Sequence, residues 1–581
     1  MTRPPFEHSF HIPVMGIGYT LDTPIKIAKY GVSSAISIVQ DDVLEKARKY
    51  YSGEYGFDYT PIFRKEFEYR SKRITGYLNL VNKIVRSEFE KLKNNAQELE
   101  KYFSLLPGNK KLSIAELDAK IVQMKPGSID VNIMTKVDRE VPDSEDSLTE
   151  ACSAFKGYAE SDLQSSVILS AGMNPRLFNY MQEFEDLFPD ANGEIKKQII
   201  IKVSDFRSAL IQGKMLAKKG LWVSEYRIES GLNCGGHAFA TEGHLMGPIL
   251  EEFKTNRASM QEEQLALCKE VWIEKDNELL KNPKQKITVQ GGLGTSNERA
   301  FLEDHYTIDG TGWGSPFLLV PEATSIDNET LLDLANAGED DIVTSDISPL
   351  GIKFTTIKNN SGARLKQQRI MDGKPGSPCY KKHLALTKDT NGKLACTASS
   401  AYQRKRIKEL DEERLSKVEY QQKFDKITEK ECICDGLAVS FLRKFNLEDK
   451  FNNGGVSICP GPNLAYFNKT YSFKEMVDHI YGKINLIDLP RPNIFLKELG
   501  LYVQHLQEKI EQVQFPLSKK AEKGIASFKE NLQKGISYYK ELTAYMSTET
   551  EAFKENFNQE LEKYLLMIDK LELVQLEEVR S

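Results

Sequence analysis

The chain of 581 residues is 40% hydrophobic and 28% charged, with a mean hydropathy of -0.44. This balance is typical of a globular protein in water and excludes a mainly disordered or fibrous chain. Lys and Arg total 78 against 84 Asp and Glu, and the net charge of -6 argues against nucleic acid as a main partner. No apolar run is long enough to cross a membrane and no secretory leader begins the sequence, so we expect a cytoplasmic protein outside the membrane.

Residues 1–340 alternate short apolar runs with helix-length segments, which is the pattern of parallel βα units. Eight such runs occur, and each ends near Gly, Ser, Asn or Pro. They are IPVMGIGY, VSSAISIV, IDVNIMTK, SSVILSAGMNP, QIIIKVSD, WVSEYRIESGLNCGGH, KITVQGGLG and GTGWGSPFLLV. Eight runs favour a closed (β/α)8 barrel, the TIM barrel of the α/β class, over an open doubly wound sheet.

One insertion and two further regions complete the expected domain organisation. Residues 62–106 carry apolar side chains at intervals of three and four, which predicts an amphipathic helical insertion in the barrel. Residues 341–496 show weak periodicity with frequent Gly, Pro, Lys and Cys, so we expect an irregular cap containing cysteines. Residues 497–581 carry two apolar helical stripes, which predict a helical hairpin with Thr548 and Glu551 as a capping box between its helices.

Two glycine-rich turns follow the last two expected strands. Gly291 and Gly292 close the run KITVQ, and Gly314 and Ser315 follow the eighth run's Gly-Trp pair. Glycine lets backbone amides approach an anion closely, and TIM barrels hold phosphate at the turns after strands seven and eight. A single glycine-rich turn is explained equally well as a tight turn with only a structural role. Two such turns in successive βα units favour a phosphate site.

A third turn places Gly235 and Gly236 directly before His237. Glycines there would bring the backbone close to a flat cofactor, and an imidazole at the mouth of a barrel can move a proton near neutral pH. The alternative is a histidine that caps a helix or bonds a carbonyl, and the residues alone leave both open.

The ordered motifs carry a family resemblance. PVMGIGYTLDTP, VNIMTK, GLNCGGHAF, VQGGLG and GTGWGSPFLLV occur in the order and spacing of the nitronate monooxygenase family, also called 2-nitropropane dioxygenase-like flavoproteins. The resemblance covers residues 10–325, and the chain is also similar to a longer subfamily whose Cys-rich extension ends in CICDGLA. It implies a TIM barrel that binds FMN and an oxidoreductase activity.

The family pattern also implies which residues contact FMN. The isoalloxazine ring would lie between the first βα turn and the Gly-Gly turn, with an asparagine and a lysine at its edge and the phosphate at the last two glycine-rich turns. These residues are Ile17, Gly18, Tyr19, Asn132, Lys202, Ser230, Gly235, Gly236, Gly291, Gly292, Gly314 and Ser315. His237 takes the place of the family's active-site histidine. The chain departs from the family pattern at Ser230, Asn233 and Cys234, so the resemblance leaves the substrate unspecified.

Four of the eight cysteines cluster in the expected cap. They are Cys379, Cys396, Cys432 and Cys434. Four thiolates suffice for a tetrahedral zinc site or an iron–sulfur cluster, although this spacing matches no standard motif. His383 is a further candidate ligand. The alternative is a set of reduced thiols that pack as small hydrophobic groups.

Three functions stay open at this level. The first is an FMN-dependent oxidoreductase that oxidises a small substrate with an acidic C–H, such as a nitroalkane, while His237 moves the proton. The second is an FMN-dependent enoyl-thioester reductase that uses NAD(P)H. The third is a non-catalytic platform that holds flavin or metal and assembles through the C-terminal helices, which also suit a homo-oligomer. An iron–sulfur cluster would favour a redox partner over dioxygen.

Overall fold

Eight parallel strands form a closed barrel in the computed structural model, and each strand pairs with the next in chain order. The first and last strands close it where His11 lies opposite Gly312. The strands are β1 (Phe10–Ile12), β2 (Ser33–Ser37), β3 (Ile129–Ile133), β4 (Ser165–Leu169), β5 (Lys197–Val203), β6 (Val223–Glu229), β8 (Lys286–Gln290) and β9 (Gly310–Gly312). The expected (β/α)8 barrel is therefore confirmed. The structure describes residues 7–107, 121–135, 138–140, 148–170, 172–237, 241–275, 279–388, 392–452, 454–511, 518–547 and 549–571.

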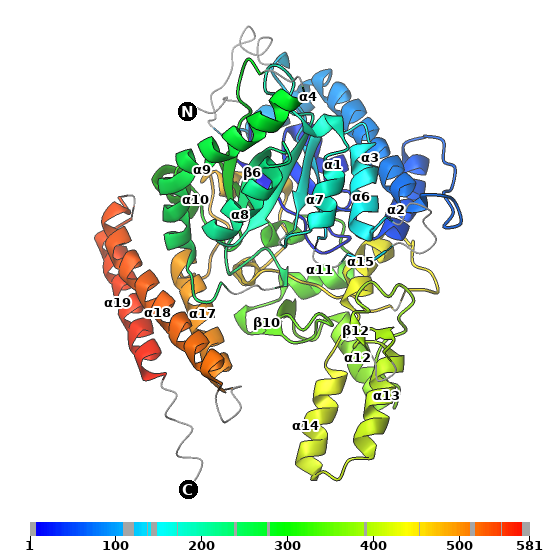
Figure 1. Cartoon of the computed structure of the whole chain (residues 1–581), viewed down its shortest axis with the longest axis vertical. Helices are drawn as coiled ribbons and strands as arrows, with labels where there is room; N and C mark the ends of the chain where they lie inside the picture. The colour runs from blue at the N-terminus through cyan, green and yellow to red at the C-terminus, as the bar shows by residue number, and fades with distance from the viewer. Residues whose placement is uncertain are drawn as a thin grey trace.

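Helices surround the barrel on its outer side (Figure 1). They are α1 (Thr23–Ile27), α2 (Asp41–Glu54), α3 (Tyr69–Lys93), α4 (Ala96–Leu105), α6 (Glu150–Ala159), α7 (Pro175–Met181), α8 (Phe206–Ala217), α9 (Met246–Glu274) and α10 (Ser296–His305). The insertion consists of α3 and α4, and α3 packs against α2 and α6. Its stripe of Ile74, Leu78 and Val81 is fully buried, because a spacing of three and four places these side chains on one helical face.

The first strand ends earlier than its apolar run. β1 stops at Ile12, and the chain then turns at Gly16, whose φ is 54°. Beyond this turn the amides of Ile17 and Gly18 donate to the carbonyl of Leu437, at 3.3 and 3.1 Å. The residues after β1 are apolar because the cap covers them. The apolar run is therefore longer than the strand itself.

The cap contains more regular structure than its weak periodicity indicated. After α11 (Asn328–Ala335), which precedes the cap, its elements are β10 (Ile342–Ser345), β11 (Phe354–Ile357), α12 (Ser361–Met371), β12 (Thr387–Lys388), β13 (Leu394–Ala395), α13 (Ser400–Asp411), α14 (Lys417–Thr428), α15 (Ile433–Lys444) and α16 (Phe473–Ile480). A three-stranded antiparallel sheet of order β10-β11-β7 joins the cap to the barrel, since β7 (Gly236–His237) belongs to the segment after β6. α13 and α14 lie side by side and project from the body at the bottom of Figure 1.

The C-terminal region contains three described helices, α17 (Ile494–Glu511), α18 (Lys519–Leu542) and α19 (Glu551–Lys570). α18 and α19 form the expected hairpin, and α17 packs against both. The stripe of α18 that includes Phe528, Leu532 and Ile536 is buried. Thr550 caps α19 by accepting the amide of Phe553, which corrects the expected capping box, and Thr548 lies outside the described residues.

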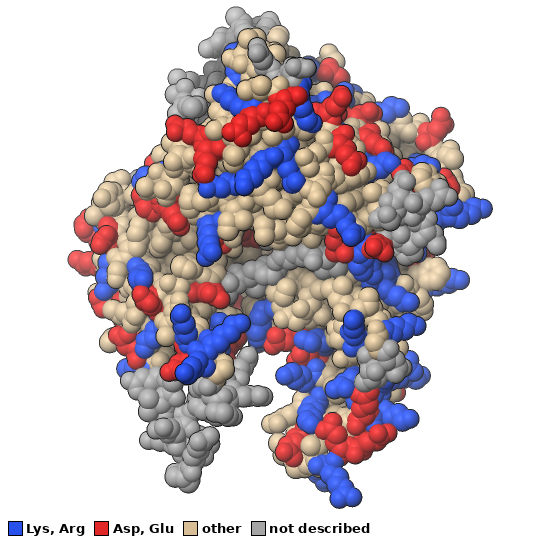
Figure 2. All heavy atoms as spheres, in the orientation of Figure 1, with Lys and Arg blue, Asp and Glu red and all other residues tan. Residues whose placement is uncertain are grey.

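Charged side chains of both signs are interspersed on the face shown in Figure 2, in keeping with the small net charge. Among the described residues, the search for helices long and apolar enough to span a membrane finds none.

Candidate active site

The carboxyl ends of three barrel strands bring a polar cluster together. Lys202 of β5 pairs with Glu229 of β6, with 3.0 Å between Nζ and Oε2. Gln290 of β8 donates from Nε2 to the other oxygen of Glu229 at 2.8 Å. Lys202 was expected here, whereas sequence reasoning missed Glu229 and Gln290. Their position in the sequence could have identified them, because each is a polar residue at the end of an apolar strand. TIM barrels place their active sites at the carboxyl ends of the strands.

One buried amide oxygen in this region, Asn132 Oδ1 on β3, lacks a hydrogen-bond partner among the described residues. An unsatisfied buried acceptor costs about 1–3 kcal/mol, so a ligand or an ordered water is expected to supply the missing donor. A Cβ built on Gly236 would meet no atom within 4 Å, which shows that the backbone there faces open space. The Asn132 oxygen suits the donor groups at the polar edge of a flavin.

The turn after β6 packs directly against the glycine turn after β8. Ser230 donates from its hydroxyl to the carbonyl of Gly291 at 2.9 Å. A Cβ on Gly291 would lie 2.8 Å from the Cα of Asn233, and one on Gly292 would lie 2.4 Å from a side-chain carbon of Leu232. With φ values of 95° and 79° at the two glycines, the turn accepts only residues that lack a side chain. Ser230 therefore links the two turns that were expected to hold FMN.

The last expected phosphate turn also meets this loop, but its hydroxyl already has partners. Ser315 donates to the carbonyl of Cys234 at 3.1 Å and accepts the amide of Gly461 at 2.6 Å. Gly314 lies so close that a Cβ on it would be 2.8 Å from the Cβ of Cys234. The Ser315 hydroxyl is therefore committed to contacts within the chain, and a phosphate at this turn stays a prediction.

The first βα turn contacts the cap. The amides of Ile17 and Gly18 are bonded to α15, as described above, and the hydroxyl of Tyr19 donates to the carbonyl of Ser457. A Cβ on Gly18 would lie 2.9 Å from the Cβ of Phe441 of the same helix. The structure thus places these three residues under the cap, and their contact with a flavin ring stays a prediction.

His237 sits where the loop after β6 enters the cap sheet. Its backbone pairs with Phe354 of β11, and the Phe354 ring packs edge-on against the imidazole with 5.1 Å between centroids. Nε2 is 2.8 Å from the hydroxyl of Ser348, a side chain that is fully buried. Sequence reasoning missed Ser348, because it lies in the segment expected to be irregular and no local pattern marks it. The contact fixes the orientation of the ring.

A carboxylate from the C-terminal helices holds the same loop. Glu498 of α17 accepts the amide of Gly231 at 2.9 Å with one oxygen and the amide of Met246 at 2.8 Å with the other. Burial raises the pKa of Glu498 to about 7, against the lowering effect of these two backbone donors. The protonation of one residue on α17 is therefore coupled to the loop that carries Ser230 and His237.

We expect Glu498→Gln to change how stability depends on pH. A carboxyl whose pKa is raised on folding contributes stability that is fully present below its ordinary pKa of 4.5 and is lost as the pH rises through 7. The free energy of unfolding of the wild type should therefore fall by about 3 kcal/mol relative to the variant between about pH 5 and pH 8. Urea denaturation at both pH values measures this, with Glu511→Gln, an exposed position on the same helix, as control. A difference between the two proteins that does not change with pH would contradict the coupling.

Two of the four cysteines expected to bind metal lie close together, since the sulfurs of Cys432 and Cys434 are 4.0 Å apart. The hydrogen bond with Cys396 lowers the pKa of Cys379 to about 6, and the same contact raises the pKa of Cys396. All eight cysteines are free thiols. In the part of the chain that the structure describes, no group of three or more His, Cys, Asp or Glu side chains is arranged to hold a metal ion, so zinc, an iron–sulfur cluster and a redox partner stay predictions.

Comparison with known proteins finds no matching family model and no matching curated protein. The chain is similar to solved structures at low identity. FabK from Thermotoga maritima is 11% identical, with a TM-score of 0.37, over 87% of this chain and 96% of that one. The enoyl reductase domain of MlnA from Bacillus amyloliquefaciens is 17% identical, with a TM-score of 0.34, over 69% and 89%. Nitroalkane oxidase from Streptomyces ansochromogenes is 8% identical, with a TM-score of 0.34, over 82% and 94%. TM-scores this low carry no argument about activity, and the fold assignment rests on the closed barrel itself.

Proposed function

We propose that the protein is an FMN-dependent oxidoreductase whose active site lies at the carboxyl end of the barrel. The observation that carries the proposal is the polar cluster of Lys202, Glu229 and Gln290 together with the unpartnered oxygen of Asn132. The cluster lies at the end of the barrel where TIM-barrel enzymes place their active sites. It is accompanied by the glycine turns that the family resemblance assigns to FMN.

Different residues suit the two ends of FMN, which are the ring and the phosphate. Asn132 and Lys202 offer an acceptor and a positive charge to the polar edge of the ring, and Gly236 leaves room for its face. The resemblance assigns the phosphate to the turn at Gly291 and Gly292 and to the turn at Gly314 and Ser315. Bound FMN would accept or donate a pair of electrons at its ring.

The chain's own residues would bind and deprotonate the substrate. We propose a small molecule with an acidic C–H, such as a nitroalkane or an activated carbonyl compound, from which His237 takes the proton. Ser348 holds the imidazole at Nε2, which restricts the ring to one orientation during the transfer. Glu229 fixes the position of Lys202 through their ion pair, so that the positive charge stays at the edge of the site.

Anaerobic mixing tests this proposal. The purified protein should carry FMN, and a nitroalkane should bleach its absorbance, whereas NAD(P)H should not. Rapid bleaching by NAD(P)H followed by reoxidation with an enoyl thioester would replace the proposal with the reductase alternative. Turnover of either kind would contradict a purely structural platform, and a colourless protein that fails to bind added FMN would contradict all flavin chemistry.

Ser348→Ala should lower kcat by about tenfold, because one hydrogen bond that orients the imidazole is worth about 1–1.5 kcal/mol. KM and the flavin spectrum should stay unchanged, and the pH profile of kcat should shift. Ser348→Thr keeps the hydroxyl and should restore the profile. A loss of rate in Ser348→Ala without a change in the pH profile would indicate only a packing role.

The C-terminal helices remain the proposed surface for a homo-oligomer. α19 exposes Leu566 and Met567 on its outer side. Because Glu498 lies in α17 and holds the loop after β6, a truncation that tests assembly should retain α17 and remove only the residues after Glu511. Sedimentation of the truncated protein measures its oligomeric state.

A further inference from the structure

We propose that the cap carries a docking surface for an acidic protein beside the mouth of the barrel. This surface, the cap patch, consists of Tyr380, Lys382, Lys450 and Phe451. The inference stands on the exposure, the contacts and the charges of these four residues and does not depend on flavin chemistry.

Two exposed aromatic side chains of the cap patch lie in contact. Tyr380 is 58% exposed and Phe451 is 50% exposed. Their ring centroids are 5.5 Å apart and their planes are at 77°, which is an edge-to-face arrangement. The contact joins two loops that are far apart in the sequence, yet each ring leaves about half of its surface in water. Aromatic side chains that are exposed and held in place are typical anchors of protein interfaces.

The loops that carry the two rings are fixed to the barrel. Lys381 donates to Gln40 at 2.6 Å and pairs with Asp42 at 3.4 Å. On the other loop, Asp449 pairs with Lys46 of α2 at 2.8 Å. Because both loops are tied down, a partner would lose little conformational entropy in ordering the rings.

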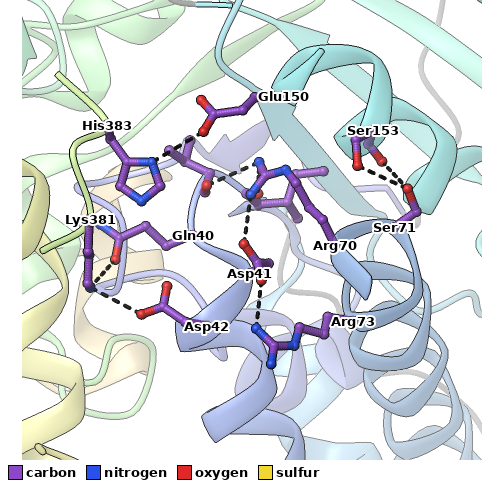
Figure 3. A network of polar contacts seen from close by, with 12 residues as sticks. Gln40, Asp41, Asp42, Arg70, Ser71, Arg73, Glu150, Ser153, Lys381 and His383 are labelled. Carbon is purple, nitrogen blue, oxygen red and sulfur yellow. Dashed lines mark hydrogen bonds and ion pairs between the residues drawn. The ribbon is translucent and has the colours of Figure 1, made fainter. Parts of the chain in front are cut away.

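The same contacts place the cap patch beside the barrel mouth. Gln40 and Asp42 lie at the start of α2, after the carboxyl end of β2. His383 lies 3.6 Å from Glu150, at the start of α6. Figure 3 shows Lys381 and His383 pointing from the cap loop toward these residues. A protein docked on the patch would therefore lie next to the end of the barrel that carries the candidate active site.

The two lysines of the cap patch have charges available to a partner. Lys382 and Lys450 are exposed, and neither forms an ion pair with an acidic side chain in the described part of the chain. The neighbouring carboxylates pair with Lys381 and Lys46 instead, as described above. The ammonium of Lys450 lies 5.3 Å from the centroid of the Phe451 ring, so positive charge and aromatic surface are combined in one place.

The surrounding segment is strongly basic. Residues 353–408 contain 14 Lys and Arg but only 2 Asp and Glu, which gives the segment a charge of +12. The whole chain carries -6, so the remaining residues carry -18. A local positive field of this kind steers an acidic partner toward the cap.

These observations favour a protein over other anionic partners. A nucleic acid or an anionic membrane would extend beyond the cap, where it would meet the negative charge of the remaining chain. Nucleic acid bases also need free aromatic faces, whereas Tyr380 and Lys450 cover part of the Phe451 ring. A compact acidic protein can place apolar side chains on the two rings and carboxylates on the two lysines without contacting the acidic residues elsewhere.

Binding of a synthetic peptide to the full-length protein tests the proposal. The probe is an amphipathic helical peptide with Glu on one face and Leu on the other. One matched peptide has Gln in place of Glu, and a second has Ser in place of Leu. Titration calorimetry should show that the probe binds at least about tenfold more tightly than either matched peptide. Its affinity should fall by at least about tenfold between about 0.05 and 0.5 M salt, because salt screens exposed charges.

A double variant measures the contribution of the charges. Lys382→Glu combined with Lys450→Glu should weaken binding of the probe by at least about tenfold, because two attractive contacts become repulsive. The matched control is Lys519→Glu combined with Lys523→Glu, two exposed positions on α18. This control changes the net charge equally and should bind the probe as the wild type does.

A second double variant measures the contribution of the aromatic pair. Tyr380→Ser combined with Phe451→Ser should also weaken binding by at least about tenfold. The matched control is Phe63→Ser combined with Tyr545→Ser, whose rings are 55% and 64% exposed in other parts of the structure. This control should leave the affinity unchanged.

Three results would overturn the proposal. The first is a wild-type protein that does not bind the probe or does not distinguish it from the matched peptides, a measurement that needs no variant. The second is equal weakening by the patch variants and their controls. The third is tighter binding of a single-stranded oligonucleotide or of phosphatidylserine vesicles than of the probe at equal charge, which would assign the surface to nucleic acid or to a membrane.

Discussion

Replacement of His237 with alanine should lower kcat by about 10²–10⁴-fold, the usual contribution of a positioned acid or base. The flavin should stay bound, because the proposed FMN contacts come from the backbone turns and from Asn132 and Lys202. Steady-state turnover of a nitroalkane, together with the absorbance of the bound flavin, measures both effects.

The matched control for this change is His305→Ala. His305 lies at the end of α10, where it stacks on Phe301 and lies 3.5 Å from Glu251, away from the barrel mouth. Its variant should turn over at the wild-type rate. Equal activity of the two variants would remove His237 from the proposed chemistry, whereas loss of flavin in His237→Ala alone would assign it to binding.

Gly235→Ala should disrupt the packing of the cap against the barrel mouth. The new Cβ would lie 1.7 Å from the carbonyl oxygen of Cys459, and the backbone φ of 116° is unfavourable for a residue with a side chain. Strain and overpacking together should lower the free energy of unfolding by about 3 kcal/mol or more. We also expect a reduced FMN content, since Gly235 lies in the loop that packs on Gly291. Urea denaturation and flavin content measure the two effects.

A variant of the neighbouring glycine distinguishes the effect of the steric clash from the effect of the backbone strain. Gly236 has a similarly positive φ of 91°, but a Cβ there meets open space. Gly236→Ala should therefore lose only the strain contribution, about 1–2 kcal/mol. If the two variants were equally stable, the contact between Gly235 and the carbonyl of Cys459 would not be part of the folded protein.

The barrel could be predicted from sequence because its signal is local. Each apolar run closed by Gly, Ser, Asn or Pro marks one strand, and the spacing between runs leaves room for a helix. The boundaries were less predictable, as β1 shows. Ile17 and Tyr19 are hydrophobic because α15 and Ser457 of the cap cover them, and periodicity cannot distinguish burial in a strand from burial under a distant segment.

The candidate site also has some residues that the sequence predicted and others that only the tertiary structure identified. Lys202 and Asn132 were expected from the resemblance, and both lie on barrel strands. Glu229 and Gln290 complete the cluster, but only the pairing of β6 with β8 brings their side chains together. Ser348 and Glu498 reach the loop after β6 from segments more than a hundred residues away, and such contacts leave no local pattern.

The sequence by itself determined the alternation of strands and helices, the glycine turns at their ends and the amphipathic stripes of the insertion and the C-terminal helices. These follow from backbone geometry and from the burial of apolar side chains, which act over a few residues. Only the tertiary structure decided that Ser348 holds His237 and that α17 supports the barrel mouth. Each of these contacts joins residues that are far apart in the sequence. The chemistry of one side chain does not by itself specify which distant residue it will contact.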